Sequence, residues 1–315
     1  MDKKSPILEA KGLTKILGGR PIVSNLSFRV YPGEIYGFLG PNGAGKTTTI
    51  RMLTGLIYPS MGSVHINGVN LRENRGDALK NIGCIVENPE LYKYLTAIEN
   101  LKQFARLKDG VNEDYLYSLL VKVGLPNNGD QKVGTFSLGM RQRLGLAQAL
   151  IGKPKVLILD EPMNGLDPQG MKDIRDIIIS LAREHKMAIF ISSHLLHEIQ
   201  IIADRVGIID NGRLIAENRV SNLLSDKVLS IKVAEPEKTL NMIMSSYGLS
   251  GFVKGEEIQL DLRKGVEMTD VIRFLTTKKI DILDIRTIDQ ELEDIFFKLV
   301  DKAPLKTDEE MEGVK

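Results

Sequence analysis

Residues 40–47 read Gly40-Pro41-Asn42-Gly43-Ala44-Gly45-Lys46-Thr47 and match the pattern G-x-x-x-x-G-K-[ST]. The five residues before them, Ile35 to Leu39, predict a short buried strand. The residues after them, Thr48 to Leu53, predict a helix that Gly55 caps. This strand–loop–helix order is the setting in which such a loop binds phosphate, and it makes a chance Gly-rich turn the weaker interpretation.

The glycines of this loop allow backbone N–H groups to wrap an anion, and the helix N-terminus adds its dipole. We expect Lys46 to place its charge at the β- and γ-phosphates of a nucleotide and Thr47 to offer its hydroxyl to Mg²⁺. The predicted nucleotide contacts are all eight loop residues together with Thr48.

Composition indicates a folded chain with balanced charge. The 315 residues fit one large domain or two ordinary ones. The net charge of +1 gives no support for a dedicated nucleic-acid binder. One cysteine, Cys84, excludes an intramolecular disulfide or Cys-cluster metal site, and its apolar neighbours predict a buried structural thiol. With no signal peptide and no run near the roughly 18 apolar residues of a membrane helix, we expect a cytoplasmic protein.

The rest of the pattern predicts an α/β fold with a helical insertion. Antiparallel strands over 7–39 and a strand over 62–68 come first, and residues 95–151 are helix-patterned between strands 82–86 and 156–159. The remaining elements follow in order: a helix from Asp167-Pro168 to His185, strand 187–192, helix 195–202, and strands 206–210 and 213–217 joined by a turn at Asn211-Gly212.

After Ser221 the pattern restarts as a small α+β appendage. Its predicted strands are 228–233, 259–262 and 280–288, and its predicted helices are 240–247, 269–277 and 292–300. The predicted domains are therefore an ATPase-type domain over 1–220, with a helical subdomain at about 89–155, and an accessory domain over 221–302. Residues 303–315 contain Asp308-Glu309-Glu310 and predict a disordered acidic tail.

Two acidic residues follow the buried run 156–159. Because ligands of open α/β sheets bind at the carboxyl ends of the strands, Asp160 should reach Mg²⁺ and Glu161 should act on the attacking water as general base. Two further segments aim polar groups the same way. Ser137 predicts an N-cap that opens a helix toward an anion, and His194 follows a strand end. Either residue alone would more often be structural.

Together these segments resemble the ATP-binding subunit of an ATP-binding cassette (ABC) transporter over about residues 7–217. Residues 40–47 match Walker A, 156–161 match Walker B with its catalytic glutamate, and 136–140 match the signature motif. Residues 164–167 match the D-loop, and His194 matches the switch histidine. The resemblance implies a P-loop cassette fold with a mixed sheet core, an antiparallel β subdomain and a helical subdomain.

The same resemblance implies a mechanism. Two cassettes would sandwich two ATP molecules, so that Ser137 and Gly139 of one subunit contact the nucleotide held by the other. His194 would hold the γ-phosphate and orient the water with Glu161, and Asp167 would link the two sites. The implied cofactors are ATP and Mg²⁺. The implied partners are a second cassette and one or more membrane permease subunits, with the cassette peripheral on the inner face of the cell membrane and no nucleic acid.

Three positions depart from the family pattern. The signature is usually L-S-G-G-Q, but here Leu138 and Met140 replace a glycine and the glutamine. The aromatic residue that stacks on adenine would fall at Leu17, so that packing would be aliphatic. The family's metal-ligating glutamine is Glu87, a stronger ligand for a hard cation.

Glutamate at that position resembles the cassettes of bacitracin-resistance and lantibiotic-immunity exporters. The expected function is therefore an ATPase that powers export of a peptide antibiotic or related amphiphile through a separate permease. A soluble cassette ATPase acting on ribosomes or DNA, a non-hydrolysing regulatory subunit, an importer subunit, and an exporter subunit for lipids or drugs are the alternatives. The intact Lys46, Asp160, Glu161 and His194 argue against the non-hydrolysing one.

Overall fold

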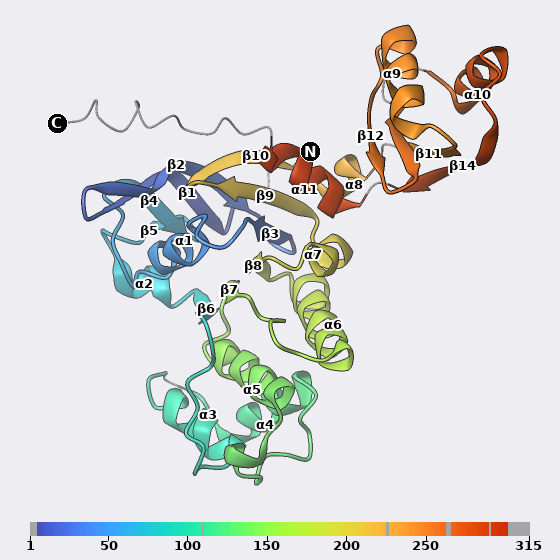
Figure 1. The fold of residues 1–315 in the computed structure, drawn as a ribbon. Coiled ribbons are helices and arrows are strands. Elements are labelled where there is room, and N and C mark those ends of the chain that lie inside the picture. The colour runs from blue at the N-terminus through green and yellow to red at the C-terminus, as the bar shows by residue number, and fades with distance from the viewer. Residues whose placement is uncertain (1–4, 109, 225–226, 263–265, 290, 302–315) are drawn as a thin grey trace. The chain divides into compact units, whose positions relative to one another are not determined.

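The computed structural model describes all residues except 1–4, 109, 225–226, 263–265, 290 and 302–315 (Figure 1). The described residues form two compact units, one over residues 5–217 and 299–301 and the other over 218–298. The predicted disordered tail, 303–315, lies outside the described residues. No helix in the described part of the chain is both long and apolar enough to cross a membrane.

The first unit contains two sheets. One is a four-stranded sheet in the order β2-β1-β4-β5, and the other has six strands in the order β10-β9-β3-β8-β7-β6. The strands of the first sheet are β1 (Leu8–Leu17), β2 (Arg20–Val30), β4 (Met61–Ile66) and β5 (Val69–Asn70). Those of the second are β3 (Ile35–Leu39), β6 (Ile82–Ile85), β7 (Val156–Asp160), β8 (Ala188–Ser193), β9 (Arg205–Asp210) and β10 (Arg213–Arg219).

Four aromatic side chains join these two sheets. Phe28 comes from β2, Tyr36 and Phe38 come from β3, and Phe190 comes from β8; all are at most 3% exposed. Their ring centroids lie 5.2–5.9 Å apart, within the range that favours offset or tilted aromatic packing. This cluster fixes β3 and β8 side by side, and both strands end at the phosphate-binding loop and its neighbours.

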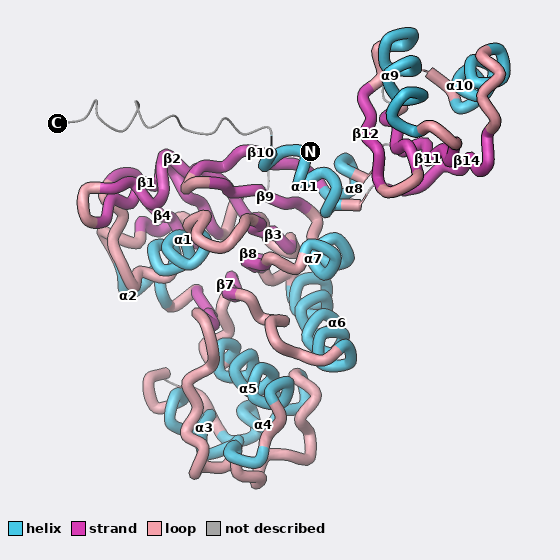
Figure 2. Tube along the Cα trace, viewed as in Figure 1, coloured by secondary structure: helices cyan, strands magenta, loops and turns pink. Residues whose placement is uncertain are grey.

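Three helices, α3 (Ala97–Ala105), α4 (Glu113–Lys122) and α5 (Leu138–Leu150), gather in a separate layer below the sheets in Figures 1 and 2. Each begins at a side-chain cap, which satisfies a backbone N–H that the helix leaves unpaired. The cap of α3 is Thr96, that of α4 is Asn112, and that of α5 is Ser137. The other helices of this unit are α1 (Lys46–Leu53), α2 (Arg75–Leu79), α6 (Pro168–His185) and α7 (Leu196–Ile202).

The helix after the phosphate-binding loop ends as predicted at Gly55. Gly55 has a φ of +69° and donates to the Met52 carbonyl, while Leu56 donates to the Arg51 carbonyl. These two bonds form a Schellman motif, which needs a left-handed residue at this point. The predicted cap at Asp167 with Pro168 at the first helical position is also confirmed, as is the turn at Asn211-Gly212, where both residues have positive φ.

The second unit, over 218–298, has a βαββαβ order. Its sheet runs β12-β13-β11-β14, and all three neighbouring strand pairs described in it are antiparallel, which is the split βαβ arrangement of ferredoxin-like folds. The strands are β11 (Lys227–Val233), β12 (Ser250–Lys254), β13 (Glu257–Asp261) and β14 (Ile282–Asp289). The helices are α8 (Val220–Leu223), α9 (Pro236–Tyr247) and α10 (Met268–Thr277), and α11 (Leu292–Asp301) begins in this unit, although its residues from 299 onward are assigned to the first.

Some short features differ from the sequence prediction. The prediction omitted β5, α2 and β12, which have two to five residues each and are too short to show a periodic pattern. The prediction of a buried thiol at Cys84 was wrong, because β6 lies at the edge of the six-stranded sheet and Cys84 is exposed there.

Candidate functional site: the carboxyl ends of β3, β7 and β8

Strand order brings the chemically active segments together. Strands β3, β8 and β7 are adjacent and parallel, so their carboxyl ends meet at one edge of the sheet. In the register Leu39 lies opposite Ser193, and Asp160 lies opposite Ser192. The phosphate-binding loop follows β3, the acidic pair closes β7, and His194 follows β8.

Lys46 lies inside the phosphate-binding loop, with 7% of its surface exposed. Its Nζ donates to the carbonyl oxygen of Gly40 at 2.8 Å and to that of Pro41 at 3.3 Å. A Cβ on Gly40 would come within 2.4 Å of the Ile209 carbonyl oxygen, so the loop packs on β9 only because this residue is glycine. Gly45, with a φ of +104°, turns the chain into α1.

Asp160 lies deep in the sheet, with 2% of its surface exposed. The Ser192 hydroxyl donates to its Oδ1 at 2.5 Å. Burial raises the pKa of the Asp160 carboxyl, while hydrogen bonds from Ser192 and Thr47 act to lower that pKa. A carboxylate beside the Thr47 hydroxyl is an all-oxygen donor set, and Mg²⁺ prefers such ligands, usually one or two protein groups completed by phosphates and waters.

Glu161 lies between two basic groups. Its Oε2 is 2.8 Å from His194 Nδ1 and accepts from the His194 backbone N–H at 3.3 Å, and its Oε1 is 3.5 Å from Lys46 Nζ. Glu161 has a φ of +49°, a left-handed conformation that is uncommon for a residue with a side chain. Two hydrogen bonds from its N–H to Ser192, at 3.1 Å to the carbonyl oxygen and 3.2 Å to the hydroxyl, hold it there. The carboxylate is therefore fixed beside the phosphate-binding loop.

The predicted signature and D-loop segments are adjacent in the chain's own fold. Ser137 caps α5 by accepting from the Met140 N–H at 3.2 Å, and Asp167 caps α6 by accepting from Gly170 at 3.0 Å. A Cβ on Gly139 would lie 3.9 Å from the Gly170 Cα and from Leu166 Cδ2. Both helix starts therefore lie beside each other.

Two predicted residues lie apart from this constellation. Glu87 is exposed, has a φ of +65°, and its Oε1 is 2.6 Å from the Arg51 guanidinium on α1. Within the described residues, no group of three His, Cys, Asp or Glu side chains could hold a metal ion, so Glu87 does not join Asp160 and Glu161 in a cluster. Leu17, 49% exposed, stands at the end of β1 with its backbone opposite Arg20.

Sequence reasoning missed three contributors. Ser192 contacts both acidic residues, and Arg51 holds Glu87; the only sequence signal for Ser192 is its place at the end of a strand beside His194. The third is Gln142, which is buried on α5 and donates to the Pro162 carbonyl at 3.2 Å. Gln142 thus ties the helix that Ser137 begins to the residue following Glu161.

Comparison with known proteins agrees with this geometry. A family model described as "ABC transporter" matches residues 23–164. The chain is 45% identical over 295 residues to the uncharacterized ABC transporter ATP-binding protein YhcH of Bacillus subtilis, covering 93% of this chain and 95% of that protein. It is 41% identical to the bacitracin transport ATP-binding protein BcrA of Bacillus licheniformis, covering 94% of this chain and 98% of that protein.

The lantibiotic transport ATP-binding protein SrtF of Streptococcus pyogenes is 46% identical over 211 residues, which is 67% of this chain and 90% of that protein. Among solved structures, one titled "Structure of ATP binding subunit of ABC transporter" superposes with a TM-score of 0.63 at 29% identity, covering 70% of this chain and 92% of that one.

Proposed function

The chain belongs to the ATP-binding proteins of ABC transporters, and from this we propose that it powers the export of a peptide antibiotic or related amphiphile through a separate permease. As a member of that family it binds ATP and couples ATP hydrolysis to transport. The observation that carries the finer proposal is near full-length identity of 41% to a bacitracin transport subunit, together with 46% identity to a lantibiotic transport subunit over two thirds of the chain.

In the proposed reaction the nucleotide phosphates lie on the loop over 40–47, with Lys46 and the N–H groups of α1 as their partners. Thr47 and Asp160 would hold Mg²⁺, which neutralises charge that develops on the phosphates. Glu161 accepts a proton from the attacking water, and His194, which contacts Glu161 Oε2, keeps that carboxylate aimed. Lys46 contacts Glu161 Oε1, so phosphate and carboxylate would share the charge of one lysine.

The remaining assignments extend this proposal beyond one chain. We assign residues 1–220 to the ATPase domain, about 89–155 to its helical subdomain, and 221–302 to an accessory domain. A second cassette would meet the α5 and α6 starts, with Ser137, Gly139 and Asp167 reaching its nucleotide. Leu17 would pack on adenine, Glu87 would complete the metal site after leaving Arg51, and the protein would work on the inner face of the membrane.

The chemistry is tested by Glu161→Gln. That variant should bind ATP but hydrolyse it at least about 100-fold more slowly, because a general base contributes about 10²- to 10⁴-fold. Glu184→Gln is the matched control, since Glu184 is exposed near the end of α6. Near-normal turnover in Glu161→Gln would exclude it as the base.

The transport assignment is tested in cells that lack the gene, complemented with the wild-type chain or with Glu161→Gln. Only the wild-type chain should restore tolerance to bacitracin or to a lantibiotic, while tolerance to an antibiotic acting inside the cell stays constant. A tagged chain should also recover a polytopic membrane protein from solubilised membranes. Recovery of ribosomes in place of that protein would overturn the transporter assignment.

A further inference from the structure

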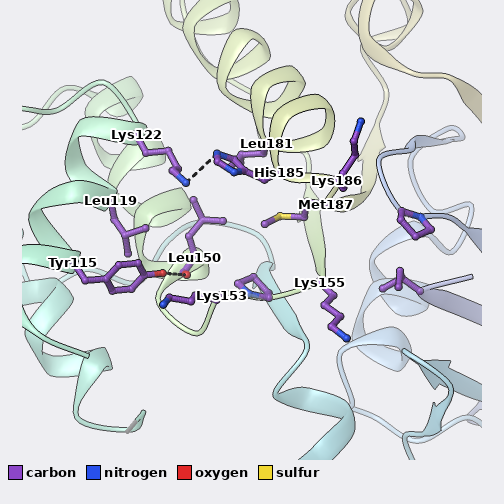
Figure 3. A pocket seen from close by; sticks show the side chains of 13 residues that line it. Tyr115, Leu119, Lys122, Leu150, Lys153, Lys155, Leu181, His185, Lys186 and Met187 are labelled. Carbon is purple, nitrogen blue, oxygen red and sulfur yellow. Dashed lines mark hydrogen bonds between the residues drawn. The ribbon is translucent and has the colours of Figure 1, made fainter. Parts of the chain in front are cut away.

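A pocket of about 530 Å³ lies at the opposite end of the same sheet from the proposed nucleotide site. It is bounded by α4, the end of α5, the loop before β7, and the turn between α6 and β8 (Figure 3). Lys155 directly precedes β7 and Met187 directly precedes β8, whereas Asp160 and Ser192 stand near the other ends of those strands. At about 3.3 Å per residue, a five-residue strand separates the two sites by roughly 16 Å.

The walls of this pocket are apolar and its rim is basic. Leu119, Leu150, Leu181 and Met187 are buried, with exposed fractions of 8% or less. Around them stand four exposed lysines and a histidine, which are Lys122, Lys153, Lys155, Lys186 and His185. No acidic side chain of the described chain lines the pocket.

The positive charge of the rim is not neutralised. In the part of the chain that the structure describes, no carboxylate lies within ion-pair distance of any of the four lysines. Lys122 Nζ lies 3.0 Å from His185 Nε2, and Lys153 Nζ lies 5.0 Å from the centroid of the Tyr115 ring; neither contact brings a negative charge to the amine. Figure 3 shows Lys122 directed at His185 and Lys153 beside Leu150 and Tyr115.

Backbone geometry also favours a role for these lysines. Lys153 and Lys186 follow the ends of α5 and α6 with φ of +49° and +55°, positions where glycine carries no steric cost. A lysine after a helix can simply bond the last carbonyls, but neither Nζ makes such a bond in the described structure. Both residues line the same cavity, although each occupies a backbone conformation that is uncommon for a residue with a side chain.

We propose that this pocket binds a phosphate ester that carries an apolar group. Several lysines that lack a carboxylate partner suit a group with a charge near −2, and lysine binds phosphate as a compact point charge. The apolar walls suit the rest of the molecule, and the volume lies within the usual range for small-ligand sites. The phosphate ester could be a membrane phospholipid or a soluble organic phosphate, since both present the same chemistry.

Titration calorimetry on the full chain tests the proposal, with Mg²⁺ and a non-hydrolysable ATP analogue at saturation so that the phosphate-binding loop is filled. The probes are monomeric dihexanoyl phosphatidic acid, inorganic phosphate, and dihexanoyl phosphatidylcholine, whose headgroup charge is cancelled. We expect the phosphatidic acid to bind with a saturable isotherm and to bind more tightly than either other probe.

The variant is Lys122→Gln with Lys153→Gln. It should bind phosphatidic acid at least about tenfold more weakly, because each lysine makes a charge-assisted contact to phosphate. The matched control is Lys11→Gln with Lys80→Gln, which removes the same charge from exposed lysines outside the pocket. Both variants should keep the circular dichroism spectrum and ATPase rate of the wild-type chain.

Three results would overturn the proposal. They are absence of saturable binding, equal affinity of the pocket variant and the wild-type chain, and equal affinity of inorganic phosphate and phosphatidic acid. Flotation with vesicles that contain phosphatidic acid separates the two sources. Flotation that depends on Lys122 and Lys153 assigns a membrane lipid, and binding of the soluble ester alone assigns a soluble phosphate.

Discussion

Removal of the Ser192 hydroxyl should destabilise the protein by about 2 kcal/mol at neutral pH, because hydrogen bonds to charged groups contribute about 1.5–3 kcal/mol. The hydroxyl lies 2.5 Å from Asp160 Oδ1, and both residues are at most 2% exposed, so water does not replace the lost bond. The Glu161 N–H loses one of its two acceptors on Ser192 but keeps the carbonyl oxygen at 3.1 Å. The loss therefore falls mainly on Asp160.

The loss of unfolding free energy caused by Ser192→Ala should depend on pH. Burial already raises the pKa of Asp160, and the Ser192 bond is one of the contacts that lower that pKa, so Ser192→Ala raises the pKa further. A carboxyl whose pKa is raised by folding contributes stability below its unfolded pKa and loses it as pH rises through the folded pKa. Because this loss is greater in the variant, the difference in unfolding free energy should widen as pH rises above the usual range of an aspartate.

Urea unfolding followed by circular dichroism measures this, with one transition fitted for each compact unit. Ser193→Ala is the matched control, since the Ser193 hydroxyl accepts from the Leu195 N–H at 2.9 Å and touches no carboxylate. Loss of that neutral hydrogen bond should lower the unfolding free energy by about 1 kcal/mol at every pH. A Ser192→Ala cost below about 0.5 kcal/mol, or one that is the same at about pH 5 and about pH 8, would refute the reasoning.

Three other changes have defined outcomes. Asp160→Asn should stop Mg²⁺-dependent hydrolysis. The same variant should unfold at a higher urea concentration at neutral pH, because it removes a buried charge that folding disfavours, and this gain in stability should shrink as pH falls. Glu87→Gln should change the unfolding free energy by less than about 1 kcal/mol, since the ion pair of Glu87 with Arg51 is exposed. If this variant lost transport but kept its ATPase activity, Glu87 would be shown to couple ATP hydrolysis to transport. Gly40→Ala should cost about 2–3 kcal/mol in urea unfolding, because the added Cβ meets the Ile209 carbonyl at 2.4 Å; a smaller cost would show that the loop shifts freely.

Local features of the site could be predicted from sequence because each depends on a few consecutive residues. The loop over 40–47, the caps at Ser137 and Asp167, and the strand that ends at Asp160 all follow from short motifs and capping rules. These features lie together because their strands are adjacent and parallel, and the carboxyl ends of parallel strands meet at one edge of a sheet.

Contacts between distant segments could not be predicted in this way. Arg51 pairs with Glu87 across 36 residues of sequence, and no local pattern marks either as the other's partner. The exposure of Cys84 depends on which strand lies at the sheet edge, which the apolar run around it does not reveal. The basic pocket draws its lysines from three separate segments, and no local pattern marks that these segments meet.

Residues near the two ends of β7 and β8 differ in how much they contribute to stability. At the carboxyl ends, Asp160 is buried and depends on Ser192, so a change there costs folding energy as well as catalysis. Near the other ends, Lys122 and Lys153 are exposed, and neither makes an ion pair within the described structure. Substitution of these lysines should therefore change the free energy of unfolding only slightly. Lysines that have no carboxylate partner beside an apolar cavity are therefore better explained by a ligand than by stability. Binding at the pocket should for this reason be separable from both the stability and the ATPase activity of the chain.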